Sequence, residues 1–413
     1  MPSQKTSFST QPYKGTRDFY PKESIIDWSD KIHSKQKHNY YFEILSKTLK
    51  SYGFCEYSSS IIEDAEVFVA KSGDELGSEQ LYKFQDKGNR AIALRPELTL
   101  SVARMVAGQF ENLRFPLRWF CSDNCFRYER PQKGRSREFW QTEINIIGAE
   151  AGGVDLEMLI LTVELFKAFG AKPNMFKIMF NHRGVLDKWI EQNDWQSQKS
   201  IIFKVLDNWF KLDENTRRLE LSKTLNSNDC DKIIATVHKQ GPEWQEYLNI
   251  AFEFEELNLI INNLSKIYPN YVLEFTPAII RGQAYYTGLI FEAFDTNPSN
   301  NRSLFGGGRF DDLLGLYDKK ALAVGCAPGD VSMNEFLEGW DLYPKYFEEV
   351  TKIGIILTSN YSADELYSKI IPDLKAQNKR WDIDYSWDRS QKKRIETLKK
   401  RGCTEILIID SNK

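Results

Sequence analysis

The segment FRYERPQKGRSREF, residues 126–139, has the residue types and spacing that most directly suggest chemistry. Its cations surround a turn that contains Pro131 and Gly134. Arg127 follows Phe126 within an apolar, strand-like run, where an unpaired guanidinium would be costly, so this arginine requires an anionic partner. The planar guanidinium fork suits phosphate, which it binds in a bidentate manner. The segment is therefore either a solvated basic hairpin tip or an anion-binding site.

Two further segments combine polar side chains with strand-forming residues. In RGQAYYTG, residues 281–288, strand alternation would place Tyr285 and Tyr286 on opposite faces. At most one of them then lines a pocket, and core packing is the alternative for the pair. In LRPELT, Glu97 and Thr99 stand two apart on a predicted strand and would share a face. The alternative for Glu97 is a surface carboxylate after a proline turn.

The elements that must position these residues read as strand, loop and strand between positions 115 and 148. In the second strand, EFWQTEINIIG, alternation places Gln141, Glu143 and Asn145 on one face. Three polar side chains on one face line either a wet cavity or a solvent surface. Further along, three successive glycines in SLFGGGRFDDLL permit close approach of the backbone to a ligand, unless they form only a flexible hairpin.

The rest of the chain divides by its periodicity. Residues 38–53 and 155–169 read as helices, and FCEYSSSIIED between them reads as a strand. From 183 to 268 helical segments replace strand patterns, and strands return at 271–333. The last 64 residues, 350–413, read as βαβαβ. We predict a core in two parts, 1–182 and 269–345, a helical insertion at 183–268 and a small α/β domain at 350–413.

Composition narrows the function classes. Apolar residues make up 41% of the 413 residues and charged residues 27%, as in ordinary globular proteins. No apolar run is long enough for a transmembrane helix, and the N-terminal segment lacks an apolar signal core, so we expect a cytoplasmic protein. The six cysteines include no CxxC pair, which predicts reduced thiols and no metal site. With a net charge of −3, any contact with nucleic acid must rest on local basic patches.

Six segments in this order resemble the motifs of histidyl-tRNA synthetases, a class II aminoacyl-tRNA synthetase family. They are KGTRDFYP (Lys14–Pro21), ALRPELTLSVARM (Ala93–Met105), FRYERPQKGRSREFWQTEINIIG (126–148), RGQAYYTGLIFEAFD (281–295), SLFGGGRFDDLL (Ser303–Leu314) and AVGCAPG (Ala323–Gly329). The resemblance implies an α+β core with an antiparallel sheet flanked by helices. It also implies a ligase that forms histidyl-adenylate and transfers histidine to its tRNA. ATP with Mg²⁺, a homodimer and an anticodon-binding C-terminal domain belong to the same expectation.

The resemblance assigns roles to individual residues. On the ATP side, Arg281 would stabilise charge on the α-phosphate and Arg127 would hold the α-phosphate and the substrate carboxylate. Glu129 would bind the adenine amino group, Arg135 would reach the γ-phosphate or the tRNA acceptor end, and Arg309 would close the ATP site.

On the histidine side, the α-ammonium would be bound by Glu97, Thr99 and Gln141. The imidazole would be contacted by Asn145, Tyr285 and Tyr286, with Tyr286 favoured over Tyr285.

Four positions depart from the family pattern. Ser60 replaces the proline that ends motif 1, and Ala284 replaces an acidic residue before the tyrosine pair. Asn145 stands where a carboxylate usually faces the imidazole, and Glu143 on the same face could partly replace it. Ser332 stands where motif 3 carries an ATP-clamping arginine. Removing one such donor costs about 2.7–4 kcal/mol.

These departures, and a C-terminal domain shorter than usual, keep two other functions open. One is a synthetase-like regulatory subunit, such as the partner of ATP phosphoribosyltransferase. The other is a pseudo-synthetase that binds RNA without charging it. Histidine-dependent pyrophosphate exchange separates the enzyme from both.

Overall fold

The computed structural model describes residues 9–21, 33–69, 79–238, 245–280, 285–300, 303–344, 351–359 and 361–410. The chain forms two compact units. The first comprises Met1–Arg17 and Tyr41–Leu342, and the second Asp18–Tyr40 and Tyr343–Lys413. The sequence patterns did not indicate that Asp18–Tyr40 belongs with the C-terminal residues.

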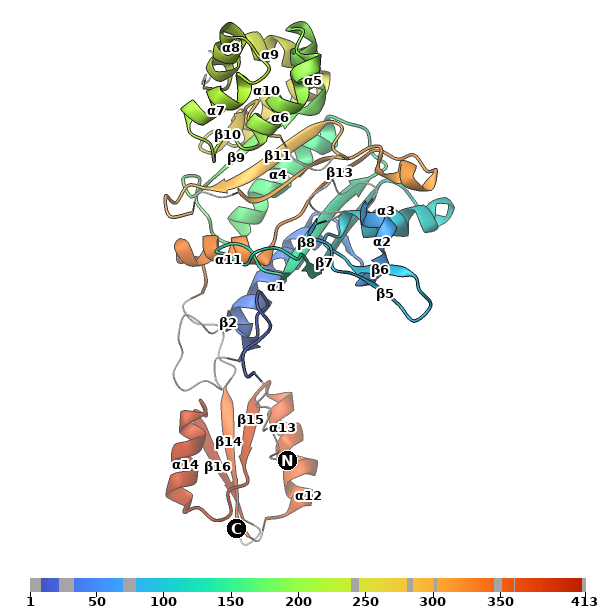
Figure 1. The fold of residues 1–413 in the computed structure, drawn as a ribbon. Helices are drawn as coiled ribbons and strands as arrows, with labels where there is room; N and C mark the ends of the chain where they lie inside the picture. Colours follow the sequence, from blue (N-terminus) through green and yellow to red (C-terminus); the bar gives the residue numbers. More distant parts are fainter. Residues whose placement is uncertain are drawn as a thin grey trace, which may run out of the picture. The chain divides into compact units, whose positions relative to one another are not determined.

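The first unit is organised by a sheet with eight strands among the described residues (Figure 1). In spatial order they are β10 (Val272–Phe275), β9 (Phe176–His182), β11 (Leu289–Asp295), β12 (Ser303–Arg309), β13 (Ala323–Cys326), β8 (Glu138–Ile147), β7 (Leu117–Phe126) and β3 (Cys55–Glu56). The five pairings from β9 to β7 are antiparallel, and the outer pairs β10–β9 and β3–β7 are parallel. The predicted antiparallel sheet is thus confirmed.

Strand β8 is buried from Gln141 to Ile147, polar and apolar residues alike. It pairs with β7 in one unbroken register from Leu117↔Ile147 to Phe126↔Glu138. The segment FCEYSSSIIED, expected to form one strand, instead contributes β3 to this sheet and β4 (Ile62–Asp64) to another. That second sheet has the order β4, β6 (Ala91–Leu94) and β5 (Lys83–Gln85).

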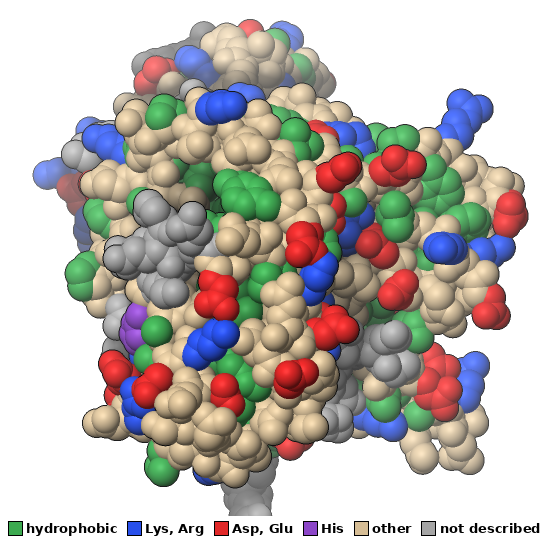
Figure 2. All heavy atoms as spheres, turned by 90° about the horizontal axis from the view of Figure 1, so that it is seen from above, with side chains coloured by type: hydrophobic (Ala, Val, Ile, Leu, Met, Phe, Trp, Pro, Cys, Tyr) green, Lys and Arg blue, Asp and Glu red, His purple; other side chains and the backbone are tan. Residues whose placement is uncertain are grey.

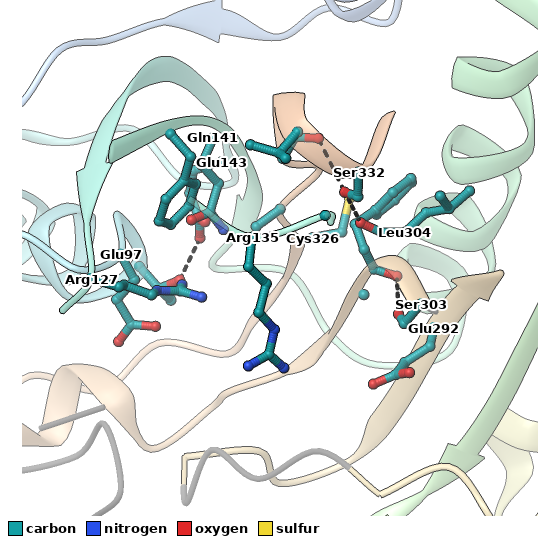
Figure 3. Close-up of a pocket in the computed structure, with 18 of the residues that line it drawn as sticks. Glu97, Arg127, Arg135, Gln141, Glu143, Glu292, Ser303, Leu304, Cys326 and Ser332 are labelled. Atoms are coloured by element: carbon teal, nitrogen blue, oxygen red, sulfur yellow. Dashed lines mark hydrogen bonds between the residues drawn. The ribbon is translucent and has the colours of Figure 1, made fainter. Parts of the chain in front are cut away.

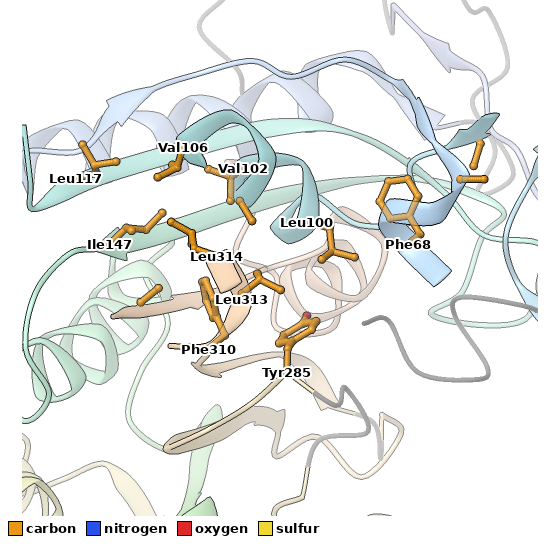
Figure 4. Close-up of a cluster of buried hydrophobic side chains, with 14 of the residues drawn as sticks. Phe68, Leu100, Val102, Val106, Leu117, Ile147, Tyr285, Phe310, Leu313 and Leu314 are labelled. Carbon is orange, nitrogen blue, oxygen red and sulfur yellow. The ribbon is translucent and has the colours of Figure 1, made fainter. Parts of the chain in front are cut away.

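A hydrophobic core joins the two sheets (Figure 4). Helix α2 (Ala65–Val69), helix α3 (Thr99–Gly108) and the 3₁₀ helices Phe110–Asn112 and Leu313–Tyr317 surround it. Leu100, Val102 and Val106 of α3 pack with Leu117 and Ile147 of the β7–β8 pair. Helix α3 thereby fixes the loop that precedes it against the sheet.

On the large sheet, aromatic packing positions two further helices, α4 (Gly153–Ala168) and α11 (Asp330–Gly339). The ring of Phe166 in α4 stacks on Phe176 of β9 at 4.1 Å between centroids and on Phe305 of β12 at 5.6 Å. It meets Phe336 of α11 edge to face at 5.2 Å. Helix α1 (Lys35–Ser51) joins the same unit from Tyr41 onward, where Tyr41 stacks on Phe169.

Between β9 and β10 the described chain is helical and belongs to the first unit. Tyr247 donates a hydrogen bond of 2.9 Å to Asn181 of β9, and His182 caps the first of these helices by accepting from the Gly184 amide. The helices are α5 (Arg183–Gln192), the 3₁₀ turn Gln196–Gln198, α6 (Lys199–Asp207), α7 (Glu214–Leu221), α8 (Ser227–His238), α9 (Gln245–Ala251) and α10 (Glu255–Ile267).

The second unit contains a parallel sheet of order β15-β14-β16. Its elements are β14 (Lys352–Leu357), α12 (Ala363–Glu365), a π-helical turn (Leu366–Ile370), α13 (Ile371–Ala376), β15 (Arg380–Asp384), α14 (Gln391–Lys400) and β16 (Glu405–Ile409). The predicted βαβαβ pattern is confirmed. Strands β1 (Phe19–Tyr20) and β2 (His33–Ser34) form a separate parallel pair in this unit.

Replacing Gly307 with alanine should destabilise the first unit. A Cβ at Gly307 would lie 2.2 Å from the Gly325 carbonyl oxygen and 2.6 Å from Cys326 Cβ, so β12 and β13 would have to separate. We expect a loss of about 1–3 kcal/mol in the free energy of unfolding, measured by denaturant titration. Gly315→Ala is the matched control, because its Cβ would meet no atom within 4 Å. Equal stability of the two variants would contradict this account.

Candidate active site

A cavity of about 460 Å³ lies over the large sheet of the first unit and is lined by residues of β8, β11, β12 and β13 (Figure 3). The loop before α3, the start of α11 and residues 285 and 286 complete its wall. The polar and aromatic side chains of the wall are Gln80, Glu97, Thr99, Arg127, Glu129, Arg135, Ser136, Phe139, Gln141, Glu143, Asp207, Tyr285, Tyr286, Glu292, Ser303, Phe305, Phe310 and Ser332. Most of the predicted site residues therefore meet in one place.

Arg127 is held in the wall from two sides. Its Nε donates to the Pro96 carbonyl at 2.9 Å, and its guanidinium lies over the Phe139 ring, 4.9 Å from the centroid. In the described part of the chain no carboxylate forms an ion pair with it. The outer edge of a fixed, permanently charged fork remains available for an anionic ligand.

Glu129 and Arg135, predicted on the ATP side, pair with each other. Arg135 Nη1 lies 3.2 Å from Glu129 Oε2, and half of the Arg135 side chain is exposed. A partly solvated pair of this kind contributes little to stability. Both side chains can therefore exchange this contact for a ligand at low cost.

Glu97 is buried in the loop before α3, with an exposed fraction of 3%. The Tyr285 hydroxyl donates to its Oε2 at 3.2 Å. The loop itself is fixed by Arg95, which is fully buried, pairs with Asp123 at 2.7 Å and donates to the carbonyls of Ser59 and Asn124. Arg95 was not predicted as a site residue, although the Arg-Pro pair before Glu97, whose backbone is conformationally restricted, was a usable signal.

Thr99 lies on a different element from the one predicted. It begins helix α3 instead of sharing a strand with Glu97. Its hydroxyl donates to Glu143 Oε1 at 2.8 Å inside the protein. Thr99 therefore reaches the cavity together with Glu143, and a direct contact with the substrate ammonium remains only a prediction.

The tyrosine pair was also placed on the wrong element. Tyr285 and Tyr286 lie outside the strands, and both line the cavity, with ring centroids 5.0 Å apart. The expectation that only one of them could do so was wrong, because strand alternation does not apply there. A Cβ on Gly308 would lie 2.8 Å from the Tyr286 ring, so the glycine makes room for this aromatic side chain.

Asn145 and Gln141 lie on β8 as predicted, but only Gln141 lines the cavity. Asn145 is fully buried on β8, and its register partner on the neighbouring strand β13 is Gly325. With its amide nitrogen turned toward acceptors, Asn145 lies 3.2 Å from Glu143 Oε1 and 3.3 Å from the Ile144 carbonyl. Asn145 thus supports Glu143 from behind, and its predicted contact with imidazole would have to pass through Glu143.

Arg309 does not belong to the cavity wall, in contrast to its predicted role with ATP. Its guanidinium is 3% exposed and pairs with Asp155 at 2.8 Å and Asp311 at 2.9 Å. This buried network joins β12 to the start of α4. Removing one partner would leave an uncompensated charge, so we assign Arg309 a structural role.

Ser332 and Arg281 are the remaining positions for which a role with ATP was considered. Ser332, in place of the family's arginine, turns its hydroxyl to the Leu304 carbonyl at 2.6 Å and supplies no cation to the cavity. Arg281 and Ala284 lie outside the described residues, so the role of Arg281 stays a prediction. Asp207 of α6 and Glu292 of β11 also line the cavity and were not predicted. Asp207 stands outside the motifs, and Glu292 lies in the segment 281–295 but follows two apolar residues of a predicted strand.

The N-terminal arm supports the site from behind. Arg17 Nη2 pairs with Asp330 Oδ2 at 2.8 Å, and Asp330 Oδ1 accepts from the Trp140 amide at 2.9 Å. The Gly15 carbonyl accepts from the Arg137 and Glu138 amides. The arm thereby ties the start of α11 to the start of β8, where the loop of Arg135 begins.

The fold is that of class II aminoacyl-tRNA synthetases. Its antiparallel sheet carries a cavity whose wall holds a fixed arginine and buried carboxylates. A family model described as histidyl-tRNA synthetase matches residues 33–329. A curated histidine–tRNA ligase of Leptospira biflexa is 37% identical over 375 residues, which cover 87% of this chain and 82% of that protein. The chain belongs to the histidyl-tRNA synthetase family.

Solved structures share the fold at low sequence identity. The histidyl-tRNA synthetase from Nostoc sp. PCC 7120 has a TM-score of 0.76 at 22% identity and covers 98% of this chain and 93% of its own. A Bacillus halodurans C protein, titled an ATP phosphoribosyltransferase regulatory subunit/histidyl-tRNA synthetase, has a TM-score of 0.74 at 18% identity, covering 98% and 99%.

Replacing Arg17 with methionine should destabilise the first unit. Burial raises the pKa of the Asp330 carboxyl and Arg17 lowers it, so losing Arg17 raises this pKa further. A raised carboxyl pKa favours the folded state at low pH, and the deficit therefore grows as the pH rises from about 4. We expect a loss of about 3–5 kcal/mol at pH 8, measured by denaturant unfolding, and a smaller loss at pH 5.

The double variant Arg17→Met, Asp330→Asn is the control for this prediction. It removes the unpaired charge and should recover part of the lost stability at pH 8. A double variant no more stable than Arg17→Met would show that the ion pair is not the source of the effect.

Proposed function

We propose that this protein is a histidine–tRNA ligase that uses ATP to activate histidine in the cavity described above. The observation that carries the proposal is the juxtaposition of Arg127, Glu97 and Gln141 in one wall. A fixed guanidinium suits the α-phosphate and the amino-acid carboxylate, while buried acceptors suit an ammonium group. The attack of a carboxylate on phosphorus needs no protein nucleophile, so positioning and charge stabilisation supply the catalysis.

ATP would bring Mg²⁺ with it, and the wall contains ligands that this ion prefers. Mg²⁺ at ATP sites binds phosphate oxygens together with one or two carboxylates. The carboxylate of Glu292 lies beside Gly306 and Ser303 in the wall and fits that need. The ion would neutralise phosphate charge at a site where Ser332 supplies none.

A regulatory subunit without ligase activity is the second candidate. Ser332 favours it, because the missing arginine weakens the ATP site. The intact constellation of Arg127, Glu97 and Tyr285 favours the enzyme, since a purely regulatory protein has no need for a fixed phosphate-binding fork beside a buried carboxylate.

The second unit would bind tRNA through helix α14. Leu398 and Ile395 pack against the small sheet. Arg394 is buried and pairs with Asp384 at 2.6 Å. The exposed cations are therefore Lys392, Lys393, Lys399, Lys400 and Arg401.

The helices between β9 and β10 offer a contrasting surface. Seen from their end of the molecule, cations and carboxylates are interspersed (Figure 2). Several are paired with each other, among them Lys199 with Asp187 and Lys232 with Glu246. Such a surface attracts RNA phosphates less than the cations of α14 do.

A homodimer and a cytoplasmic location remain expectations from the family. No described helix has the length and hydropathy to cross a membrane.

Histidine-dependent exchange of pyrophosphate into ATP tests the proposed function. The wild type should catalyse it, whereas a regulatory subunit or an RNA-binding pseudo-synthetase should not. Arg127→Ala should lower the exchange rate about 100- to 1,000-fold, because it removes a charged donor to the α-phosphate. Arg114→Ala, an exposed arginine outside the cavity wall, is the matched control and should exchange at the wild-type rate. Absence of exchange by the wild type would refute the proposal.

Charge removal on α14 tests the tRNA surface. Replacing Lys392, Lys393, Lys399 and Lys400 with alanine should leave pyrophosphate exchange unchanged but raise the tRNA concentration needed for charging. The variant would release fewer counterions than the wild type on binding tRNA, so its affinity would depend less on salt. The difference in affinity between the two proteins should therefore shrink at high salt. The control replaces Lys223 and Lys232, which belong to ion pairs on the insertion helices. Equal effects of the two sets would argue against α14 as the tRNA surface.

A further inference from the structure

Glu143 is a buried carboxylate of the cavity wall that has no role in the activation of histidine proposed above. It lines the cavity with an exposed fraction of 2%. Its Oε1 accepts from Thr99 Oγ1 at 2.8 Å and lies 3.2 Å from the Asn145 amide nitrogen. Its Oε2 has no hydrogen-bond partner among the described residues, although it is shielded from solvent. Buried acceptors in folded proteins are nearly always satisfied, so an unsatisfied one in a cavity wall points to a ligand hydrogen.

The two buried carboxylates of the wall can be assigned to the two ends of histidine. Arg127, which would hold the amino-acid carboxylate, contacts Pro96, the neighbour of Glu97. The α-ammonium is one carbon from that carboxylate, so it belongs near Glu97. Glu143 lies on β8 two residues from Asn145, whose register partner on β13 is Gly325. This leaves Glu143 for the side chain of the amino acid.

We propose that Glu143 is the residue that selects the imidazole ring, through a hydrogen bond between its Oε2 and a ring nitrogen. This inference rests on the proposed function and adds a specificity-determining residue to it. Thr99 and Asn145 occupy the other carboxyl oxygen and hold the group in one orientation. The site would then reject an amino acid of similar shape without ring nitrogens, because Oε2 would stay buried and unpaired.

The protonation of Glu143 supports this geometry. Burial, with a contribution from the charge of Glu97, raises the pKa of Glu143 to about 8. Below that pH the carboxyl carries a proton while the imidazole of free histidine, with an ordinary pKa of about 6.5, is neutral at pH 7.5. The protonated carboxyl can then donate to the unprotonated ring nitrogen. Above about pH 8 the carboxylate can instead accept from the ring N–H that neutral imidazole carries, so a hydrogen bond to the ring is available in either protonation state. The other titratable groups around Glu143 are Tyr57, Cys121, Cys125 and Cys326.

The first test uses Glu143→Leu in histidine-dependent pyrophosphate exchange, with denaturant unfolding as the check that the variant folds. Leucine has a similar volume but offers no hydrogen bond to a ring nitrogen, whereas Glu143→Gln keeps a donor and should lie closer to the wild type. We expect the half-saturating concentration of histidine to rise about 10- to 100-fold in Glu143→Leu, with a smaller effect on that of ATP. Glu138→Leu is the matched control: Glu138 lies on the same strand, outside the cavity wall, and accepts from Asn124. A wild-type histidine dependence in folded Glu143→Leu would overturn the proposal while leaving the proposed function intact.

The second test compares two ligands. β-(2-Thienyl)alanine has the shape of histidine but no ring nitrogen, and its binding is measured by competition with histidine. Both molecules carry the same α-amino and α-carboxyl groups, so their affinities differ through the ring. The wild type should bind histidine about 10- to 100-fold more tightly than the analogue, and Glu143→Leu should lose most of this preference. Equal binding of the two molecules by the wild type, or an unchanged preference in Glu143→Leu, would overturn the assignment, whereas a wild type without histidine-dependent exchange would overturn the function on which it rests.

Discussion

The cavity depends on how closely strands β12, β13 and β8 approach one another. A Cβ on Gly325 would lie 2.3 Å from the Asn145 side-chain oxygen, and one on Gly307 would meet the backbone of β13 at 2.2 Å. Because Gly325 carries no side chain, the Asn145 side chain can occupy the space beside it and support Glu143. The same lack of a side chain at Gly308 admits the Tyr286 ring. Close strand packing thus produces both the floor of the cavity and the orientation of the polar groups above it.

Charge is distributed unevenly over this framework. Among the described residues of the wall, the guanidiniums of Arg127 and Arg135 face the carboxylates of Glu97, Glu129, Glu143, Asp207 and Glu292. One of the two arginines is already paired with Glu129. A polyphosphate therefore needs further positive charge, which Mg²⁺ and Arg281 would supply in the proposed mechanism. The carboxylates in turn match a substrate that brings an ammonium group and a basic ring.

Local periodicity and motif order were enough to predict the antiparallel core, the β7–β8 pair, the cavity-facing side chains Gln141 and Glu143, and the C-terminal βαβαβ unit. They failed where a distant partner decides the position of a side chain. Arg309 pairs with Asp155, 154 residues earlier in the chain. The residues next to Arg309 in the sequence do not distinguish such an arginine from one that binds phosphate. Strand alternation also failed at Tyr285 and Tyr286, because the chain has not yet entered β11.

The departures from the family pattern can be understood as linked changes. A carboxylate at position 143 and an amide at position 145 keep one acid and one neutral group on the same face of β8. The amide donates to the acid and so helps to hold it, which a second carboxylate at 145 could not do without protonation. If Glu143 binds the imidazole as we propose, the missing charge at Asn145 need not weaken recognition of the ring. The acid then stands two residues away on the same strand, next to Thr99, whose hydroxyl at the start of α3 donates the hydrogen bond that fixes its orientation.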